Sequence, residues 1–304
     1  MRIVFMGTPE FAVASLNELI KSGADIVGVV TAPDKPAGRG QKLSESAVKQ
    51  YAVNHGLKVL QPEKLKNADF LAELKALNAQ LQVVVAFRML PEVVWNMPQK
   101  GTINLHASLL PHYRGAAPIN WAIINGEKET GVTTFFLKQD IDTGNILFTE
   151  KVTLTGRETA GELHDRLMNK GAGLLVKTVK AVESGRYKEH PQESFENIDL
   201  KHAPKLFKDD CNVDFNQPVD KVYNLIRGLS PHPTAYTSLN GKTLKIYKTT
   251  REEGEPGIQP GGFLSDNKTY LKFACADGFI SVTDLQLEGK KRLGIEEFLR
   301  GMKL

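Results

Sequence analysis

The segment Leu81-Gln-Val-Val-Val-Ala-Phe87 is apolar at four consecutive positions, from Val83 to Ala86. A strand with one face in solvent alternates apolar and polar residues, whereas a strand of a parallel sheet is buried on both faces and forms a continuous apolar run. The segment therefore predicts a strand inside a parallel sheet.

Outward from this strand, short β-branched runs alternate with amphipathic stretches. Strands are predicted at Arg2–Met6, Asp25–Val30, Lys58–Leu60, Thr102–His106, Thr133–Leu137 and Ile146–Leu154, and helices at Glu10–Ser22, Ser44–His55, Asp69–Asn78 and Thr159–Ser184. This alternation predicts an α/β domain with a doubly wound, mostly parallel, Rossmann-like sheet. Ligands of such a domain bind at the carboxyl ends of the strands.

The pattern changes after a segment that contains Pro191 and Pro204. We predict a first domain at 1–187, a linker at 188–208 and a second domain at 209–304. The second domain has one predicted helix and five short predicted strands: Pro218–Gly228, then Ala235–Leu239, Thr243–Thr249, Gly262–Leu264, Tyr270–Cys275 and Phe279–Leu287. Asn240-Gly241 and Asp277-Gly278 are strong hairpin-turn signals. Short strands joined by tight turns predict a small OB-like β-barrel.

Composition excludes several classes of protein. The 304 residues are 41% hydrophobic and 24% charged, which is ordinary globular usage and excludes disordered, fibrous and coiled-coil chains. Cys211 and Cys275 are too few for a disulfide framework or a thiolate zinc site, and the seven histidines lack ligand spacing, so we expect no metal. The sequence has neither an apolar run of ~20 residues nor a signal peptide, which predicts a cytoplasmic protein without a membrane partner.

The first predicted strand ends at Gly7 and leads into a helix, for which Thr8 is the expected N-cap. This order of strand, glycine and helix is typical of dinucleotide-binding domains. The next glycine after Gly7 is Gly23, however, and the chain contains neither G-x-G-x-x-G nor G-x-x-x-x-G-K-[ST]. Nicotinamide, flavin and P-loop chemistry are therefore disfavoured.

Three polar residues are candidates for catalysis: Asn104, His106 and Asp142. Asn104 and His106 lie two residues apart at the end of a predicted strand, so their side chains point to the same face. Asp142 follows the next strand, in a turn that Gly144 can close. An amide, an imidazole and a carboxylate brought together can polarise a carbonyl oxygen and relay a proton. Each residue taken alone is more often structural, so spacing makes the set only a hypothesis.

Longer motifs surround these residues. They are Asn104-x-His106, Ser108-Leu-Leu-Pro111, Tyr113-Arg-Gly-x-x-Pro118 and Asp142-Thr-Gly144, together with the opening Phe5-x-Gly7-Thr-Pro-Glu-Phe11 and the loop Pro33-Asp-Lys-Pro-Ala-Gly-Arg-Gly40. The first four resemble the signature of formyltransferases that use 10-formyltetrahydrofolate. The last two resemble the methionyl-tRNA formyltransferases within that superfamily, and the similarity runs along nearly the whole chain.

The resemblance implies a specific reaction. The formyl group of 10-formyltetrahydrofolate would pass to the α-amino group of methionyl-initiator-tRNA, giving N-formylmethionyl-tRNA for translation initiation. Asn104, His106 and Asp142 would be catalytic, and Ser108, Leu109, Leu110 and Pro111 would line the folate pocket. The loop with Arg39, Lys35 and Lys42 would contact the tRNA acceptor end. Arg88 is a departure, because the family commonly has glycine there.

The second domain would supply a further tRNA contact, since residues 201–304 carry 16 basic and 13 acidic side chains. Lys242, Lys245 and Lys248 lie on one predicted strand, where alternation places the first and third on one face. The segment Lys290–Arg292 adds a basic cluster. Such side chains neutralise phosphates without reading sequence, although each alone is typical of an ordinary soluble surface. We expect the protein to act as a monomer.

Two other functions remain open. A formyltransferase acting on a small amine, such as an amino sugar nucleotide or glycinamide ribonucleotide, would share Asn104, His106 and Asp142. The Arg39 loop and the basic second domain favour tRNA over such an amine. A folate- or RNA-binding protein that has lost catalysis is the second alternative, but all three candidate catalytic side chains are present.

Overall fold

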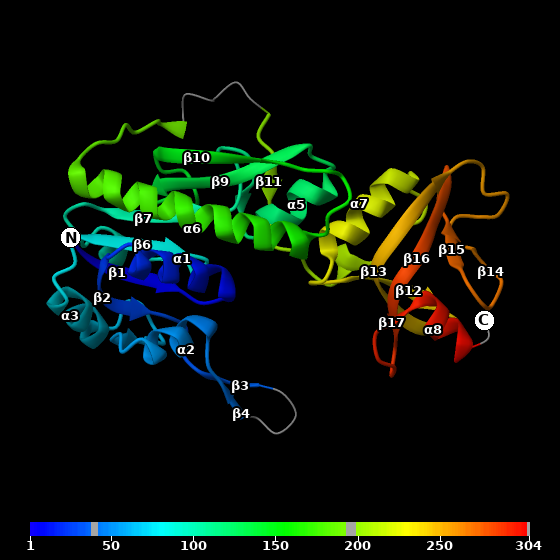
Figure 1. The fold of residues 1–304 in the computed structure, drawn as a ribbon, viewed down its shortest axis with the longest axis horizontal. Helices are drawn as coiled ribbons and strands as arrows, with labels where there is room; N and C mark the ends of the chain where they lie inside the picture. The colour runs from blue at the N-terminus through cyan, green and yellow to red at the C-terminus, as the bar shows by residue number, and fades with distance from the viewer. Residues whose placement is uncertain (38–41, 193–198, 303–304) are drawn as a thin grey trace. The chain divides into compact units, whose positions relative to one another are not determined.

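The computed structural model describes residues 1–37, 42–192 and 199–302 (Figure 1). The chain forms two compact units, each assembled from three stretches of sequence. The first unit comprises Met1–Arg114, Gly131–Val152 and Asp165–Lys201, and the second comprises Gly115–Thr130, Thr153–His164 and His202–Leu304.

A seven-stranded sheet forms the centre of the first unit. Its strands, in spatial order, are β10 (Ile146–Thr153), β9 (Glu129–Phe136), β7 (Thr102–His106), β6 (Leu81–Val85), β1 (Arg2–Gly7), β2 (Asp25–Val30) and β5 (Val59–Leu60). The pairs among β5, β2, β1, β6 and β7 are parallel, whereas β9 runs antiparallel to β7. The expected α/β domain with a mostly parallel sheet is therefore confirmed. The predicted central strand, β6, is buried at all five positions.

Helices cover both faces of this sheet. They are α1 (Glu10–Lys21), α2 (Ala47–Asn54), α3 (Ala68–Ala76), α4 (Glu92–Trp95) and α6 (Ala160–Ser184), and a hairpin of β3 (Lys35–Ala37) and β4 (Lys42–Ser44) precedes α2. Phe70 and Leu74 of α3 pack on Met6 and Val84 in one buried cluster. On the opposite face, Leu105 of β7 lies against α6, where a Cβ at Gly171 would be 2.8 Å from the leucine.

The strand order reverses between β1 and β6. From β1 the chain builds outward through β2 to β5, and then crosses to the other side of β1 to add β6, β7, β9 and β10. Such a switch point opens a crevice at the carboxyl ends of the two flanking strands, and α/β proteins bind ligands there. The end of β1 at Gly7 and the end of β6 at Val85 mark that place in this chain.

The expected N-cap of the first helix is wrong. Pro9, not Thr8, is the cap residue of α1, and it makes no side-chain capping bond. Pro9 has the extended backbone of a cap residue, with φ −84° and ψ 178°, and its carbonyl accepts the first helical hydrogen bond, from the Ala12 amide at 3.0 Å. By contrast, α2 begins with an ordinary cap, in which the Ser46 hydroxyl accepts from the Lys49 amide at 3.0 Å.

The second unit contains an antiparallel sheet of six strands. Its main path is β12 (Ala235–Leu239), β13 (Lys242–Glu253), β16 (Gly278–Leu287), β15 (Leu271–Ala274) and β14 (Phe263–Ser265), and β17 (Leu293–Gly294) pairs with β16. The other elements are β11 (His202–Ala203), a 3₁₀ helix (Asp209–Cys211), α5 (Pro118–Ile124), α7 (Val219–Leu229) and α8 (Ile295–Arg300), and β8 (Arg114–Gly115) lies at the boundary between the two ranges. Residues from α7, α8 and the sheet, among them Ile226, Phe298 and Phe273, share one core.

The two hairpin signals lie where they were expected. Asn240 and Gly241, at φ 49° and 74°, join β12 to β13 with the backbone that a two-residue turn needs. Asp277 and Gly278 lie at the β15–β16 connection. Asp277 has an additional role, because its Oδ1 accepts from the amide of Val219 at 2.7 Å and so caps the first turn of α7.

The predicted arrangement of the three lysines on β13 is wrong. Lys245 lies opposite Gln286 and Lys248 lies opposite Asp284, two residues apart on β16, so these two lysines share a face. The register of β13 on β16 shifts between Ile246 and Lys248 and again between Lys248 and Thr249, which breaks the simple alternation at this point. Strict alternation along the sequence instead places Lys248 on the same face of the strand as Lys242.

The structure contains no helix, among the residues that it describes, that is long and apolar enough to cross a membrane. Cys211 and Cys275 are buried free thiols, and burial raises the pKa of Cys275 to about 12. A thiol with such a pKa stays protonated and unreactive at neutral pH.

Glu158 is expected to make the fold sensitive to acid. Burial alone would raise its pKa, but hydrogen bonds from the Thr155 hydroxyl and from the backbone amides of Thr155 and Arg157 lower it from 4.5 to about 2. Because the folded-state pKa lies below the unfolded one, this carboxylate stabilises the fold above pH 4.5, and the contribution is lost as the pH falls through about 2.

We therefore expect Glu158→Gln to lower the free energy of unfolding by about 3 kcal/mol at pH 7. The difference in this free energy between variant and parent should shrink as the pH falls from 4.5 toward 2. Urea unfolding at several pH values measures this. Glu297→Gln, on a carboxylate that is 55% exposed, is the control and should change little. A Glu158→Gln deficit that is independent of pH would contradict the assignment.

Candidate active site

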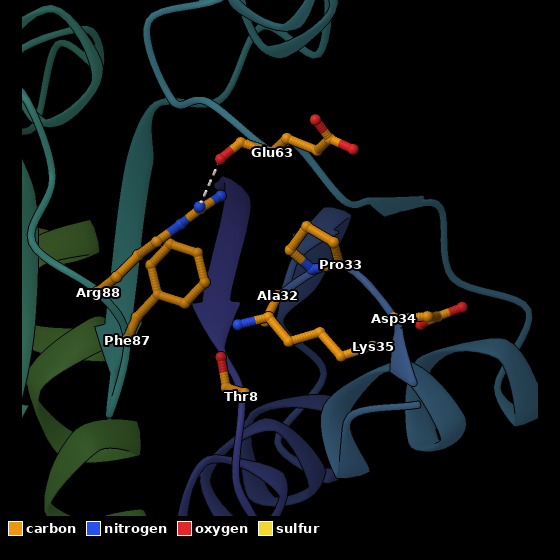
Figure 2. Close-up of a pocket in the computed structure, with 8 residues that line it drawn as sticks. All are labelled: Thr8, Ala32, Pro33, Asp34, Lys35, Glu63, Phe87 and Arg88. Carbon is orange, nitrogen blue, oxygen red and sulfur yellow. Dashed lines mark hydrogen bonds between the residues drawn. The ribbon is translucent and has the colours of Figure 1, made fainter. Parts of the chain in front are cut away.

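A cavity of about 500 Å³ lies at the switch point of the first unit. Its walls come from the segments that follow β1, β2 and β6 and from the segment after β5: Thr8, Ala32, Pro33, Asp34, Lys35, Glu63, Phe87 and Arg88 (Figure 2). This volume lies within the range of small-molecule sites. The cavity therefore lies where an open α/β sheet is expected to bind a ligand.

The segment after β2 is held firmly against its neighbours. Asp34 accepts from the Lys49 ammonium and from Gln61 Nε2, the latter at 2.8 Å, and the same Gln61 nitrogen also donates to the carbonyl of Ala32 at 2.8 Å. The hydrogen bond from Lys49, followed by that from Gln61, lowers the pKa of Asp34. This wall of the cavity is therefore fixed by charge-assisted hydrogen bonds.

Arg88 forms the opposite wall. Its guanidinium donates to the carbonyl of Glu63 at 2.8 Å and to that of Pro62, and it lies 5.6 Å from the centre of the Phe87 ring. Figure 2 shows the arginine extending beside Phe87 toward Glu63. The side chain thus ties the segment after β6 to the segment after β5, in place of the glycine that the resemblance led us to expect.

Asn104 and His106 lie on β7, next to β6 in the sheet. They share the sheet face of Val84, since Val84 lies opposite Asn104. His106 is 8% exposed. Its Nε2 is 2.8 Å from the carbonyl oxygen of Tyr113, and its Nδ1 is 3.8 Å from Asp142 Oδ2, which is within ion-pair range but too long for a hydrogen bond. Both ring nitrogens therefore face oxygen atoms.

Asp142 reaches His106 by a route that the sequence does not indicate. Because β9 runs antiparallel to β7, its last residue, Phe136, lies near the start of β7, opposite Ile103. The loop between β9 and β10 must therefore turn back along the sheet for Asp142 to lie beside His106. Asp142 itself has a positive φ of 55°, which is uncommon for a residue with a side chain.

The predicted folate loop, Ser108–Pro111, follows β7. Ser108 is fully buried, and its hydroxyl donates to the carbonyl of His112 at 2.7 Å. Thr133 of β9 fastens the loop, because its hydroxyl donates to the Ser108 carbonyl at 2.7 Å and accepts from the Leu110 amide at 3.2 Å. Leu110 packs on Phe135 and Ile146, Leu109 is partly exposed and Pro111 is buried.

The predicted tRNA contacts are placed only in part. Lys35 begins β3 and lines the cavity at the switch point (Figure 2). Lys42 begins β4, which pairs with β3. Arg39 lies outside the described residues.

A set of three residues and one further residue at this edge of the sheet were not predicted as site residues. One is the cavity wall of Thr8, Phe87 and Glu63, which could have been found from the rule that ligands lie after strand ends. The other is Gln192, which is 3% exposed and bonds to the Asp142 loop. Gln192 lies in the segment predicted as a linker, and no local pattern in the sequence indicates its burial.

Within the ranges 1–37, 42–192 and 199–302, the structure contains no group of three or more His, Cys, Asp or Glu side chains arranged to hold a metal ion.

Comparison with known proteins gives two family matches. Residues 1–179 match the model of the formyl transferase family, and residues 205–303 match that of the formyl transferase C-terminal domain. Among solved structures, an N-formyltransferase from Helicobacter canadensis, in complex with folinic acid and dTDP-3-aminofucose, is similar with a TM-score of 0.68 at 22% identity, over 96% of this chain and 99% of that one. At this identity the likeness concerns the fold alone.

Curated relatives are much closer in sequence. A methionyl-tRNA formyltransferase of Parabacteroides distasonis is 54% identical over 100% of this chain and 96% of its own length. A methionyl-tRNA formyltransferase of Flavobacterium johnsoniae is 53% identical over 99% of this chain and 96% of its own length. The matches cover 100% and 99% of this chain, so they extend through both units. The chain belongs to the formyl transferase family.

Proposed function

We propose that this protein transfers the formyl group of 10-formyltetrahydrofolate to the α-amino group of methionyl-initiator-tRNA. The observation that carries this function is the 54% identity, over the whole chain, to a methionyl-tRNA formyltransferase. The supporting geometry is a cavity at the switch point of an α/β sheet, with a polar set of side chains on the neighbouring strand.

We propose the following roles for the three polar residues. The donor folate supplies a formyl carbon, which the methionine amine attacks. A free α-amino group titrates near ~7.7–8.0, so part of it is neutral at cellular pH and a strong base is not required. Asn104 donates from its amide to the oxygen that becomes negative during the attack. His106 and Asp142 form a pair that moves the amine proton toward the leaving folate nitrogen.

The contacts of His106 favour this division of roles. Its Nε2 already faces the Tyr113 carbonyl at 2.8 Å, so a proton on that nitrogen is held by the protein. Its Nδ1 is the nitrogen that faces Asp142. An imidazolium donates from both nitrogens, and a carboxylate beside Nδ1 stabilises the charge that His106 gains when it accepts a proton.

The site offers what a folate would need. A pterin ring is flat and polar at its edge, and a p-aminobenzoyl-glutamate tail carries negative charge. The switch-point cavity combines the Phe87 ring with Lys35 and backbone groups of 32–34, and Ser108–Pro111 lies after the neighbouring strand. We propose that Ser108, Leu109, Leu110 and Pro111 support the folate, with Leu109 as the partly exposed member of the four.

A direct assay tests the proposed function. The purified protein is mixed with 10-formyltetrahydrofolate and charged initiator tRNA, and formyl-methionine is measured, with free methionine and uncharged tRNA as controls. Formylation of the charged tRNA alone is expected. If an amino sugar nucleotide or glycinamide ribonucleotide is formylated and the charged tRNA is not, the small-amine alternative replaces this proposal.

We expect Arg39→Ala to weaken formylation of charged tRNA and to leave folate binding unchanged. Each phosphate contact that is removed lowers affinity and makes binding less dependent on salt. KM for tRNA at two salt concentrations and the Kd for the folate measure the two effects. Arg186→Ala, on an exposed arginine after α6, is the control. An equal loss of folate affinity would show that the Arg39 loop serves the other substrate.

Finer features complete the proposal. The antiparallel sheet of the second unit is proposed to be an OB-like tRNA-binding barrel, with Lys245 and Lys248 on one face as part of the contact. We also propose two domains, at 1–187 and 209–304, joined by a linker at 188–208. The protein is proposed to be monomeric and cytoplasmic. Gel filtration at known concentration tests the monomer.

A further inference from the structure

Gln192 joins two motifs that the catalytic roles leave unexplained. Its Nε2 donates to the carbonyl of Asp142 at 2.9 Å and to that of Gly144 at 2.7 Å. Its Oε1 accepts from Arg114 Nε at 3.0 Å and from Arg114 Nη2 at 2.6 Å. All four groups belong to the first unit.

We propose that Gln192 is a positioning residue, which holds the loop of Asp142 against His106, and that Arg114 sets the orientation of its amide. This inference rests on the proposed function, because it assigns Asp142 to the formyl transfer.

The orientation follows from donor and acceptor chemistry. A guanidinium has only donors, so the end of the Gln192 amide that faces Arg114 must be the oxygen. The NH₂ end then faces the loop, where both partners are carbonyl oxygens that can only accept. Every bond in this set is satisfied in one orientation of the amide and lost in the other. Arg114 therefore selects the orientation in which Gln192 holds the loop.

The loop needs such a contact because of its path. It leaves β9 near the start of β7 and has to turn back toward His106, and Asp142 has a backbone conformation that is uncommon for a residue with a side chain. A bond to Asp142 and another to Gly144 fix the backbone on both sides of Thr143. The Asp142 carboxylate is thereby directed toward the imidazole.

The burial of Gln192 increases the strength of this contact. The residue is 3% exposed, so water cannot replace a lost bond at little cost. Its segment is held in place next to the loop, because His190 and Ile146 exchange two backbone hydrogen bonds of 2.9 Å. The predicted linker thus includes a residue that supports the site.

The substitution Gln192→Glu keeps the hydrogen bonds with Arg114 and removes those with the loop. A carboxylate still accepts from Arg114, but it presents an acceptor to the two loop carbonyls, where the amide presented a donor. We expect kcat for formylation to fall about tenfold or more, with KM for both substrates within twofold, because a displacement of about 1 Å of a catalytic group costs up to 100-fold in rate. Gln50→Glu, on an exposed glutamine of α2, is the control.

A double-mutant cycle with Asp142→Ala distinguishes positioning from general stability. If Gln192 acts through Asp142, then Gln192→Glu lowers kcat less than twofold once Asp142 is alanine. Arg114→Met, which frees the amide to rotate, should reproduce the kcat loss if Gln192→Glu folds poorly. Unchanged kcat in both variants, or an equal fold-loss with and without Asp142, would overturn the proposal.

Hydrogen exchange of residues 138–145 without substrate provides a readout that does not depend on the reaction. Faster exchange in Gln192→Glu and Arg114→Met than in Gln50→Glu is expected, and equal exchange overturns the inference. A parent protein that fails to formylate charged tRNA, with the exchange difference present, would contradict the proposed function and leave the contact between Gln192 and the loop established.

Discussion

Replacing Asp142 by alanine is expected to lower turnover at least about 100-fold without unfolding the protein. The carboxylate lies 3.8 Å from His106 Nδ1, and both side chains are largely shielded from water, at 13% and 9% exposed. A charge interacts more strongly in such surroundings than at a surface. In the proposed mechanism, its loss removes the group that stabilises His106 when the imidazole takes up the amine proton.

Single-turnover formylation of charged tRNA measures this effect, and circular dichroism shows whether the fold is intact. Asp140→Ala is the matched control, since Asp140 belongs to the same loop, has the same charge and is exposed. Asp140→Ala should retain nearly full activity. Near-normal turnover by Asp142→Ala would remove the aspartate from the mechanism.

The same reasoning applies to Asn104, whose amide is proposed to face the developing oxyanion. Loss of one such donor costs about 100-fold or more in turnover. Asn104→Ala should therefore match Asp142→Ala in size, and Asn104→Asp, which keeps the shape but removes the donor, should be no better than alanine. An active Asn104→Asp would show that the amide does not donate to the reacting oxygen.

The parts of the fold that could be predicted depend on local pattern. The continuous apolar run at 83–86 indicates a strand buried on two faces, and the structure confirms it as the inner strand β6 up to Val85, whereas Ala86 is exposed after the strand end. Asn104 and His106 share a face because the side-chain period of a strand is two. Asn240-Gly241 marks a turn because few residues other than glycine and asparagine adopt a positive φ at low cost.

The parts that could not be predicted depend on distant contacts or on a local shift of strand register. The apolar pattern of β9 is the same in either direction, so the sequence did not show that β9 runs antiparallel and sends the Asp142 loop back along the sheet. The register of β13 on β16 shifts on both sides of Lys248, and no pattern in the sequence indicates that irregularity. Gln192 is buried where it bonds to a loop some fifty residues away in sequence and to Arg114.

Gly144→Ala is a further substitution with a large expected effect, because the end of the Asp142 loop leaves no room for a side chain. A Cβ at this position would lie 1.5 Å from the carbonyl oxygen of Phe136 and 3.2 Å from the ring of Phe135. The oxygen belongs to backbone and cannot rotate away. Asn145, the next residue, closes the loop through its carbonyl, which accepts from the Phe136 amide at 3.0 Å.

The backbone must therefore move by an ångström or more in Gly144→Ala, and the carbonyls that Gln192 holds move with it. We expect a loss of turnover of about 100-fold, since misplacement of this size is enough to uncouple a catalytic group. The free energy of unfolding should also fall by several kcal/mol, as for other severe steric substitutions in a packed site. Activity on charged tRNA and urea unfolding measure the two losses.

Gly173→Ala is the control that isolates the cause. Gly173 lies in α6, where a new Cβ would meet nothing within 4 Å, and alanine favours a helix over glycine by about 1 kcal/mol. That variant should be as active as the parent chain and slightly more stable. If Gly144→Ala is stable but inactive, the loop has moved without unfolding the unit, and activity depends on where Asp142 lies. If Gly144→Ala is active while Asp142→Ala is not, the loop tolerates the displacement, and the close approach at Phe136 does not control the site.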